Sequence, residues 1–260
     1  MDRSSFCGKW IQRVTSLNVK RIGRSYCLRG ALAALIVMPW VCEAGDSWSA
    51  SVAATTDYVY RGVSQTDGGG AVQLGANYQN PLGWFVGVWG SNVDPYPGGD
   101  PSKELDLYAG ANHELGGDFT ARATYTHYAY IDDPRMQRYE HNELSLSVTY
   151  LDLVAATVSY QPDCSAYSDL GFAHKRATIA YELTGRWAVR EAFAVTAGGG
   201  YYDLHDLFGI SYWAGDIGIV YVNRRLSVDL SRFFAESTVA RLYENASANG
   251  SWVLSGIIRF

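Results

Sequence analysis

Charged side chains occupy the polar positions of an alternating polar and apolar pattern that begins after residue 45. Acidic and basic types are mixed there in near balance: Asp57, Arg61, Glu104, Asp106, Arg122, Glu143, Arg176, Glu182, Asp216, Arg225, Asp229 and Arg259. A charge taken out of bulk water needs a partner or bound water. These side chains therefore either pair across a filled interior or line a wet passage and set its selectivity.

A narrow, charged passage is the chemistry that this set best supports. We expect three basic side chains to face three acidic ones across a constriction, with Arg61, Arg122 and Arg176 opposite Asp57, Asp106 and Glu143. The other candidate pore-lining residues are Glu182, Asp216, Asp229 and Arg259. For any single residue, a salt bridge that only holds the structure together is as good an interpretation as a selectivity role.

The elements that position these residues are predicted to be β-strands, because the alternation has period two and helical periodicity is absent. In one segment Leu144, Leu146 and Val148 alternate with Ser145 and Ser147. Twelve such segments occur, at 48–61, 72–78, 84–93, 104–112, 119–126, 143–150, 154–160, 176–182, 192–202, 212–221, 225–231 and 252–260. The number is even, as in the single-chain barrels of bacterial outer membranes.

The connections between these segments alternate in length. Every second gap is tight: 79–83, 114–118, 151–153, 183–189 and 222–224. The others are longer and carry turn formers and charge: 62–70, 94–103, 131–141, 161–175, 203–211 and 232–250. A transmembrane antiparallel up-and-down β-barrel explains this, with tight turns on the periplasmic side and long loops outside. A soluble β-sandwich has no reason to sort its loops by parity.

Strand parity alone does not say whether the apolar face points inward, as in a soluble barrel, or outward to lipid. Three features favour lipid. The chain ends on an aromatic residue, Phe260, on the apolar face, which is the expected signal for the barrel-assembly machinery. Tyr and Trp gather at strand ends, where interfacial girdles lie. The apolar faces are mostly Ala, Val, Leu and Gly, which would fill a soluble core thinly. A secreted β-sandwich or lipocalin-like barrel is the alternative.

Residues 1–44 differ from the rest of the chain. Seven basic residues precede an apolar run of twelve, at 31–42, and a small residue, Ala44, follows. The run fits the hydrophobic region of a secretory signal peptide and is too short to span a bilayer. We therefore expect cleavage after Ala44 and a barrel domain over 45–260, with a core helix as the alternative for the apolar run.

The predicted cleavage changes the charge balance. It removes 7 of the 21 basic and 2 of the 26 acidic residues, which leaves 14 against 24 and a formal charge of −10. Such a chain is a poor partner for nucleic acid, and its charge favours cations in any passage. Three of the four cysteines are also lost, so the exported chain keeps only Cys164.

Four blocks of the sequence carry a family resemblance. They are TDYVYRGVSQT at 56–66, GWFVGVWGSNVD at 83–94, ELDLYAG at 104–110, and the Tyr, Asn and Glu within 139–144. Together they resemble the TorF family of porins, also described as Gcw_chp, a bacterial family of unknown function. The resemblance is firm over residues 48–150 and loose afterwards. It implies a Gram-negative outer-membrane barrel with a channel role, and it supplies no set of functional residues to carry over.

The function expected from these features is that of an outer-membrane porin, which allows passive diffusion of small hydrophilic solutes or ions. Its partners would be those solutes, outer-membrane lipid and the barrel-assembly machinery. Twelve strands lie between the roughly eight that leave a filled interior and the roughly sixteen that leave an open pore, so a narrow channel is expected. No cofactor and no metal are expected.

Two other functional classes stay open. The first is a non-conducting barrel that binds or adheres through its outer loops. The second is a lipid hydrolase, but no Gly-x-Ser-x-Gly elbow occurs, and no serine is spaced to meet His113 or His127. His205 lies between Asp203 and Asp206, where a solvated loop is a better interpretation than a metal site. We therefore expect that the protein is not an enzyme.

Overall fold

The computed structural model describes residues 47–94, 102–132, 139–167, 173–241 and 250–260, together with two short strands near the N-terminus. Those two strands, β1 (Ser16–Asn18) and β2 (Arg29–Ala31), pair antiparallel with each other. The rest of the predicted signal peptide, including the expected cleavage site at Ala44, lies outside the described residues.

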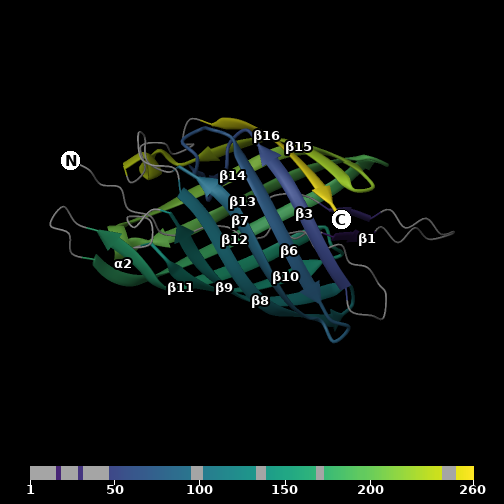
Figure 1. Cartoon of the computed structure of the whole chain (residues 1–260), viewed down its shortest axis with the longest axis horizontal. Coiled ribbons are helices and arrows are strands. Elements are labelled where there is room, and N and C mark those ends of the chain that lie inside the picture. Colours follow the sequence, from purple (N-terminus) through teal and green to yellow (C-terminus); the bar gives the residue numbers. More distant parts are fainter. Residues whose placement is uncertain are drawn as a thin grey trace.

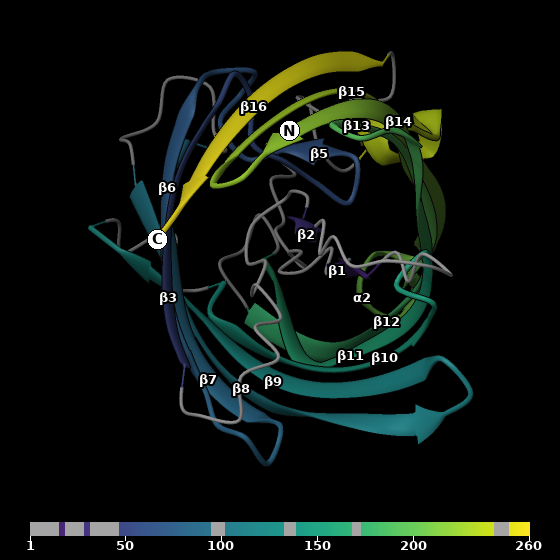
Figure 2. The same ribbon diagram turned by 90° about the vertical axis from the view of Figure 1, so that its right-hand side faces the viewer.

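The predicted twelve-stranded barrel is confirmed. The strands close into one ring (Figures 1 and 2). They are β3 (Ser47–Thr55), β6 (Ala71–Gln79), β7 (Trp84–Val93), β8 (Ser102–Gly116), β9 (Phe119–Ile131), β10 (His141–Tyr150), β11 (Val154–Tyr167), β12 (Ala173–Arg190), β13 (Phe193–Leu204), β14 (Ile210–Asn223), β15 (Leu226–Ala235) and β16 (Ser251–Arg259).

Each strand pairs antiparallel with its neighbours in the chain, and the last strand closes the ring on the first. Ser255 of β16 lies opposite Thr55 of β3, and Arg259 lies opposite Ser51. At the C-terminus the backbone nitrogen of Phe260 donates to the carbonyl oxygen of Ala50 at 2.9 Å. Because every edge is paired, the barrel leaves no open sheet edge that lipid would have to cover.

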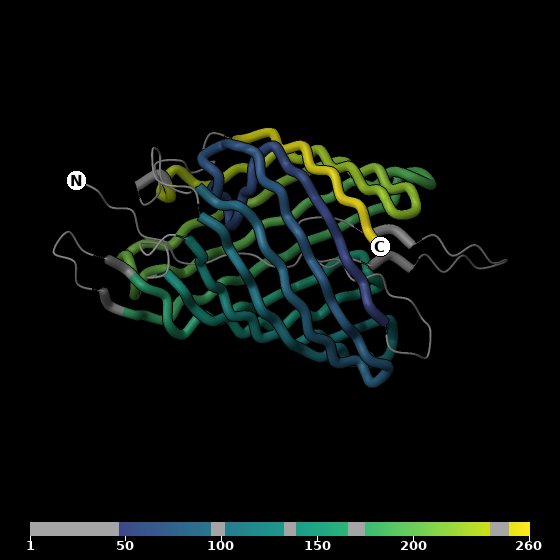
Figure 3. Tube along the Cα trace, in the orientation of Figure 1, coloured from purple at the N-terminus to yellow at the C-terminus, as the bar shows by residue number. Residues whose placement is uncertain are grey.

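The connections follow the predicted alternation, with the short turns at one end of the barrel and the long connections at the other (Figure 3). The short ones are 80–83, 117–118, 151–153, 191–192 and 224–225. The longer ones include a four-residue helix, α2 (His205–Phe208), and a 3-10 helix, η1 (Ser237–Arg241). No described helix is long and apolar enough to cross a bilayer.

Several predicted strand boundaries are wrong, and three of them differ most from the structure. β3 ends at Thr55, six residues before the predicted end, because the chain then turns into the barrel. β12 continues to Arg190 through the predicted turn at 183–189. β11 continues beyond Tyr160 past Pro162, with a register shift between Gln161 and Cys164. Proline cannot donate a ladder hydrogen bond, and this irregularity in the pairing accommodates it.

The faces of the barrel are inverted relative to a soluble protein. On β10 the side chains of Leu144 and Leu146 are 53% and 56% exposed. Inside the ring the opposite holds, since Gln73 on β6 and Gln161 on β11 are each 1% exposed. An outward apolar band with polar side chains inside is the arrangement of a transmembrane barrel, and a lipocalin-like soluble barrel would reverse it.

Aromatic side chains form a girdle at the short-turn end. Trp48 and Tyr78 have ring centroids 5.0 Å apart, and Trp84 follows at 5.9 Å from Tyr78. Two further ring pairs lie beside short turns, Phe119 with Tyr150 and Phe193 with Tyr221. Amphipathic rings of this kind settle at the boundary between hydrocarbon and water, so this girdle marks one membrane interface.

An arginine on the outer face of the barrel tests this orientation. We expect Leu146→Arg to lower the free energy of unfolding in phospholipid vesicles by about 2–4 kcal/mol, the cost of a charge facing lipid near mid-bilayer. Urea titration followed by tryptophan fluorescence measures it. Ser145→Arg is the matched control, because its side chain lies on the lumen face. Equal losses in the two variants would contradict the assigned faces.

Candidate functional site: a hairpin inside the barrel

The segment between β3 and β6 folds into the lumen as a hairpin. Its two strands, β4 (Val59–Tyr60) and β5 (Val63–Ser64), pair with each other and not with the wall, and β5 is seen within the ring in Figure 2. The two turn residues, Arg61 and Gly62, have φ of 47° and 77°. Two central residues with positive φ make the tight hairpin turn whose twist matches paired strands.

The tip of the hairpin is seated against β14 and β15. A Cβ added to Gly62 would lie 2.6 Å from the Cβ of Ala214 and 2.7 Å from the Cβ of Ala235. The hydroxyl of Tyr212 donates to the carbonyl oxygen of Arg61 at 3.0 Å. Glycine is needed here for two reasons, the positive φ and the close approach of the wall. A larger residue at the tip would therefore prevent this contact with β14 and β15.

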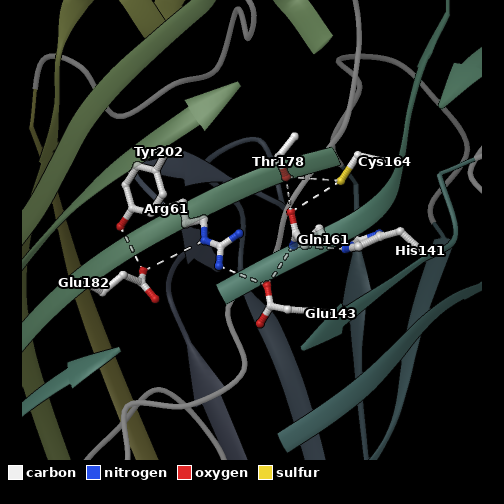
Figure 4. Close-up of polar contacts among 8 residues, drawn as sticks. All are labelled: Arg61, His141, Glu143, Gln161, Cys164, Thr178, Glu182 and Tyr202. Carbon is white, nitrogen blue, oxygen red and sulfur yellow. Dashed lines mark hydrogen bonds and ion pairs between the residues drawn. The ribbon is translucent and has the colours of Figure 1, made fainter. Parts of the chain in front are cut away.

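The Arg61 side chain points away from that wall, toward carboxylates on β10 and β12. Its Nη2 donates to Glu143 at 3.0 Å, and its Nε lies 3.9 Å from Glu182 (Figure 4). The Tyr202 hydroxyl donates to the same Glu182 carboxylate at 3.1 Å. The rings of Tyr60 and Tyr202 lie 5.1 and 5.5 Å from the guanidinium carbon, within cation–π range. The hairpin is therefore held on both sides of the lumen.

A chain of hydrogen bonds orients Glu143 (Figure 4). The Gln161 amide donates to Glu143 at 2.8 Å, and the Thr178 hydroxyl donates to the Gln161 carbonyl oxygen at 2.8 Å. His141 lies 3.4 Å from the Gln161 nitrogen and stacks on Tyr128 at 4.4 Å. Because buried polar groups in such a network hold one another in place, the carboxylate is positioned before any solute arrives.

Asp57 stabilises the base of the hairpin. Its carboxylate accepts hydrogen bonds from the hydroxyls of Ser64 at 2.6 Å and Thr66 at 3.1 Å. Burial raises the pKa of Asp57 above its ordinary value, and these two hydrogen bonds oppose that rise. The Asp57 carboxylate therefore forms these hydrogen bonds within its own loop. This position differs from the expected one opposite an arginine.

The expected three-arginine constriction is only partly formed. Arg61 contacts Glu143, one of the three carboxylates expected to face the arginines. Arg122 on β9 is buried, with its guanidinium 3.9 Å above the ring of Phe85. Arg176 near the start of β12 is exposed and donates to the carbonyl oxygen of Lys175, so it does not face the constriction. The register shift lies on β11, so Arg176 keeps the inward parity of Thr178, and it is exposed because it lies near the end of its strand.

The other candidate residues are spread along the wall. Asp106 on β8, Asp216 on β14 and Asp229 on β15 are buried, and the Ser231 hydroxyl donates to Asp229 at 2.6 Å. Arg259 is partly buried and donates to the Ser227 hydroxyl at 2.8 Å, whereas Arg225 is exposed in a short turn. The pore-lining role of these residues stays a prediction.

Residues that sequence reasoning missed complete the site. Gln161, Thr178, Tyr202 and Tyr212 all contact the hairpin or its partners. Continuing the alternation of β11 by one step would have placed Gln161 on the inner face beside Ser159. No local signal links Tyr212 to the hairpin, because 151 residues separate it from Arg61.

The described lumen is richer in carboxylates than in guanidinium groups. Seven acidic side chains are buried, Asp57, Glu104, Asp106, Glu143, Glu182, Asp216 and Asp229, against three arginines, Arg61, Arg122 and Arg186. Among the described residues no group of three or more His, Cys, Asp or Glu side chains could hold a metal ion. The described residues of the lumen supply fixed charges and hydrogen-bonding groups.

A closed barrel with an apolar exterior, a charged interior and a hairpin held across its lumen has the architecture of the outer-membrane porin class. The chain belongs to the Gcw_chp family, described as "Bacterial protein of unknown function", whose profile matches residues 42–240. Among curated proteins, none matches the chain.

Solved porins have a similar fold. The chain is similar to a structure described as "KdgM porin in complex with disordered oligogalacturonate", with a TM-score of 0.52 and 8% identity over 82% of this chain and 99% of that one. It is also similar to the NanC porin, with a TM-score of 0.54 and 6% identity over 82% of this chain and 98% of that one. At these identities the likeness establishes the fold.

Proposed function

We propose that this protein is an outer-membrane channel for passive diffusion of small hydrophilic solutes or ions, and not an enzyme. The observation that carries the proposal is the hairpin seated across a polar lumen. A channel needs a constriction that sets size and charge selectivity, and a hairpin that narrows a polar lumen supplies one. The resemblance to the TorF porins supports the same function.

Recording in planar bilayers tests the proposal. Protein purified from the outer-membrane fraction of expressing cells is expected to give discrete conductance steps in potassium chloride. The same purification from cells that do not express the protein is the control for contaminating porins. Absence of steps above that control would contradict the channel function. Retained surface binding with zero conductance would instead favour the adhesion class.

The excess of carboxylates in the lumen favours cations over anions. Seven buried acidic side chains against three buried arginines agree in sign with the formal charge of −10 expected for residues 45–260. The reversal potential in a potassium chloride gradient measures this preference. A reversal potential that shows anion selectivity would contradict the predicted cation preference. It would not contradict the proposal that the protein is a channel.

We propose that Phe260 is the assembly signal and that residues 1–44 are removed on export. Phe260 is 63% exposed at the end of the barrel, where another protein can reach it. Phe260→Ser is expected to reduce the amount of assembled, heat-modifiable barrel in the outer-membrane fraction several-fold. Leu82→Ser, in a short turn and 85% exposed, is the control for loss of an exposed apolar group. Full assembly of the Phe260→Ser variant would show that Phe260 is not the assembly signal.

The removal of residues 1–44 has its own test. N-terminal sequencing of the purified protein shows whether the chain begins at residue 45, and a sequence that begins at Met1 would contradict the cleavage.

A further inference from the structure

A second feature of the lumen is a cavity between the hairpin and the wall that β13 to β16, β3 and β6 form. It holds about 80 Å³ of internal space and is partly open to solvent. The hairpin contributes Tyr58, Arg61 and Gly62 to its lining. One water needs about 10–15 Å³ of such space, so the cavity has room for several waters or for a solute of a few heavy atoms.

The charge on the cavity lining is negative. Three carboxylates line it, those of Asp57, Asp216 and Asp229, against one guanidinium, that of Arg61. The Arg61 guanidinium is turned to Glu143 and Glu182 on the other side. Fixed charges act strongly where protein replaces water, so the sign of the lining favours a cationic occupant.

An independent observation on the same cavity also points to a ligand. Gln73 on β6 lines the cavity and is 1% exposed, and neither its amide nitrogen nor its amide oxygen has a hydrogen-bond partner among the described residues. A buried amide left without partners is costly, and such a group in a native structure needs an explanation. A ligand with a hydrogen-bond donor would satisfy the Gln73 oxygen.

The remaining lining residues narrow the class of ligand. The aromatic side chains of Tyr58, Tyr202 and Phe233 line the cavity, and aromatic faces attract organic cations. Hard metal ions prefer several oxygen ligands close together, and no described group of acidic or histidine side chains meets that need. An ammonium group on a small organic solute suits carboxylates, an amide oxygen and aromatic faces together.

We propose that this cavity is a binding site for small organic cations that carry an ammonium group, and that it selects them as they pass the hairpin. The site rests on the proposed channel function for its physiological use. The contrast with the KdgM structure, described as a complex with oligogalacturonate, is chemical: oligogalacturonate is a polyanion, whereas this cavity has an excess of carboxylates.

Calorimetry with three probes of matched size tests the site. Ethanolammonium, ethylene glycol and glycolate share a two-carbon skeleton and differ in charge, from positive to neutral to negative. Detergent-solubilised protein from the outer-membrane fraction is expected to bind ethanolammonium at least about tenfold more tightly than either other probe. Equal binding of glycolate, or no binding of ethanolammonium, would overturn the proposal.

Two variants of the cavity and one control localise the binding. Asp216→Asn with Asp229→Asn removes two charges at constant shape and is expected to weaken ethanolammonium binding about tenfold or more. Gln73→Met removes the amide and is expected to weaken binding without loss of thermal stability, since no buried amide is then left unsatisfied. Asp206→Asn, exposed in α2, should bind as the parent does. Undiminished binding by both cavity variants would overturn the proposal.

Conductance in potassium chloride separates this inference from the proposed function. Steps in potassium chloride without ethanolammonium binding would refute the cation site and leave the channel. Binding by calorimetry without steps would refute the channel and support the site. Heat-dependent gel migration confirms that each variant is a folded barrel before it is titrated.

Discussion

Replacing Arg61 with methionine is expected to lower the free energy of unfolding of the barrel by about 3 kcal/mol, because two carboxylates lose the guanidinium between them in a buried site. The side chains of Arg61, Glu143 and Glu182 are 7%, 5% and 4% exposed. The same change should strengthen cation preference, since it removes the positive charge of the hairpin. Urea titration in vesicles and the reversal potential measure the two effects.

A triple variant separates charge from shape in this prediction. Arg61→Met combined with Glu143→Gln and Glu182→Gln leaves no charge in the cluster, so much of the lost stability should return. Gln161 and Tyr202 can still donate to the two new amide oxygens, because each donates to the corresponding carboxylate. Equal instability of the single and triple variants would show that packing of the arginine stem, and not its charge, holds the hairpin.

Gly62→Val is expected to displace the hairpin and raise single-channel conductance about twofold or more, toward that of an unobstructed twelve-stranded lumen. The substitution meets two obstacles at once. Gly62 has φ of +77°, and its Cβ would lie 2.6 Å from Ala214 and 2.7 Å from Ala235. A branched side chain is strained at such a φ by about 1–3 kcal/mol, and the wall leaves it no space.

Gly68→Val is the matched control for this variant. Gly68 has φ of +75° in the same loop, but nothing lies within 4 Å of its added Cβ. Both variants therefore carry the backbone strain, and only Gly62→Val adds the collision with β14 and β15. An equal rise in conductance in both would mean that loop strain, and not seating of the tip, governs the passage. No rise in either would mean that the hairpin does not limit the current.

Most of the barrel could be predicted from the sequence, because one physical rule governs it. Each strand alternates between lipid and lumen, so Leu144 and Leu146 could be assigned outward and Glu143 inward without any knowledge of partners. The ends of the strands are less predictable from the alternation of polar and apolar residues. β12 runs on through Gly185, Arg186 and Trp187, where the alternation is interrupted, and it therefore looked like a turn.

The hairpin could not be predicted in the same way. Its first strand, β4, continues the alternation of β3, so Tyr58 and Tyr60 looked like two more steps of the wall. Charge alone indicates that Arg61 faces carboxylates across the lumen, but it does not select Glu143 or show the route by which Arg61 reaches the lumen. That route depends on contacts with residues such as Tyr212 and Ala235, which lie far along the chain and have no local signature.

The same separation along the chain imposes an order on biogenesis. The hairpin emerges directly after the first barrel strand, but its resting place combines β10, β12, β14 and β15. Contacts between such distant segments form late, because the loop between them must close first. A partly assembled barrel therefore lacks these contacts, and the hairpin reaches its final position only after β15 has joined the sheet.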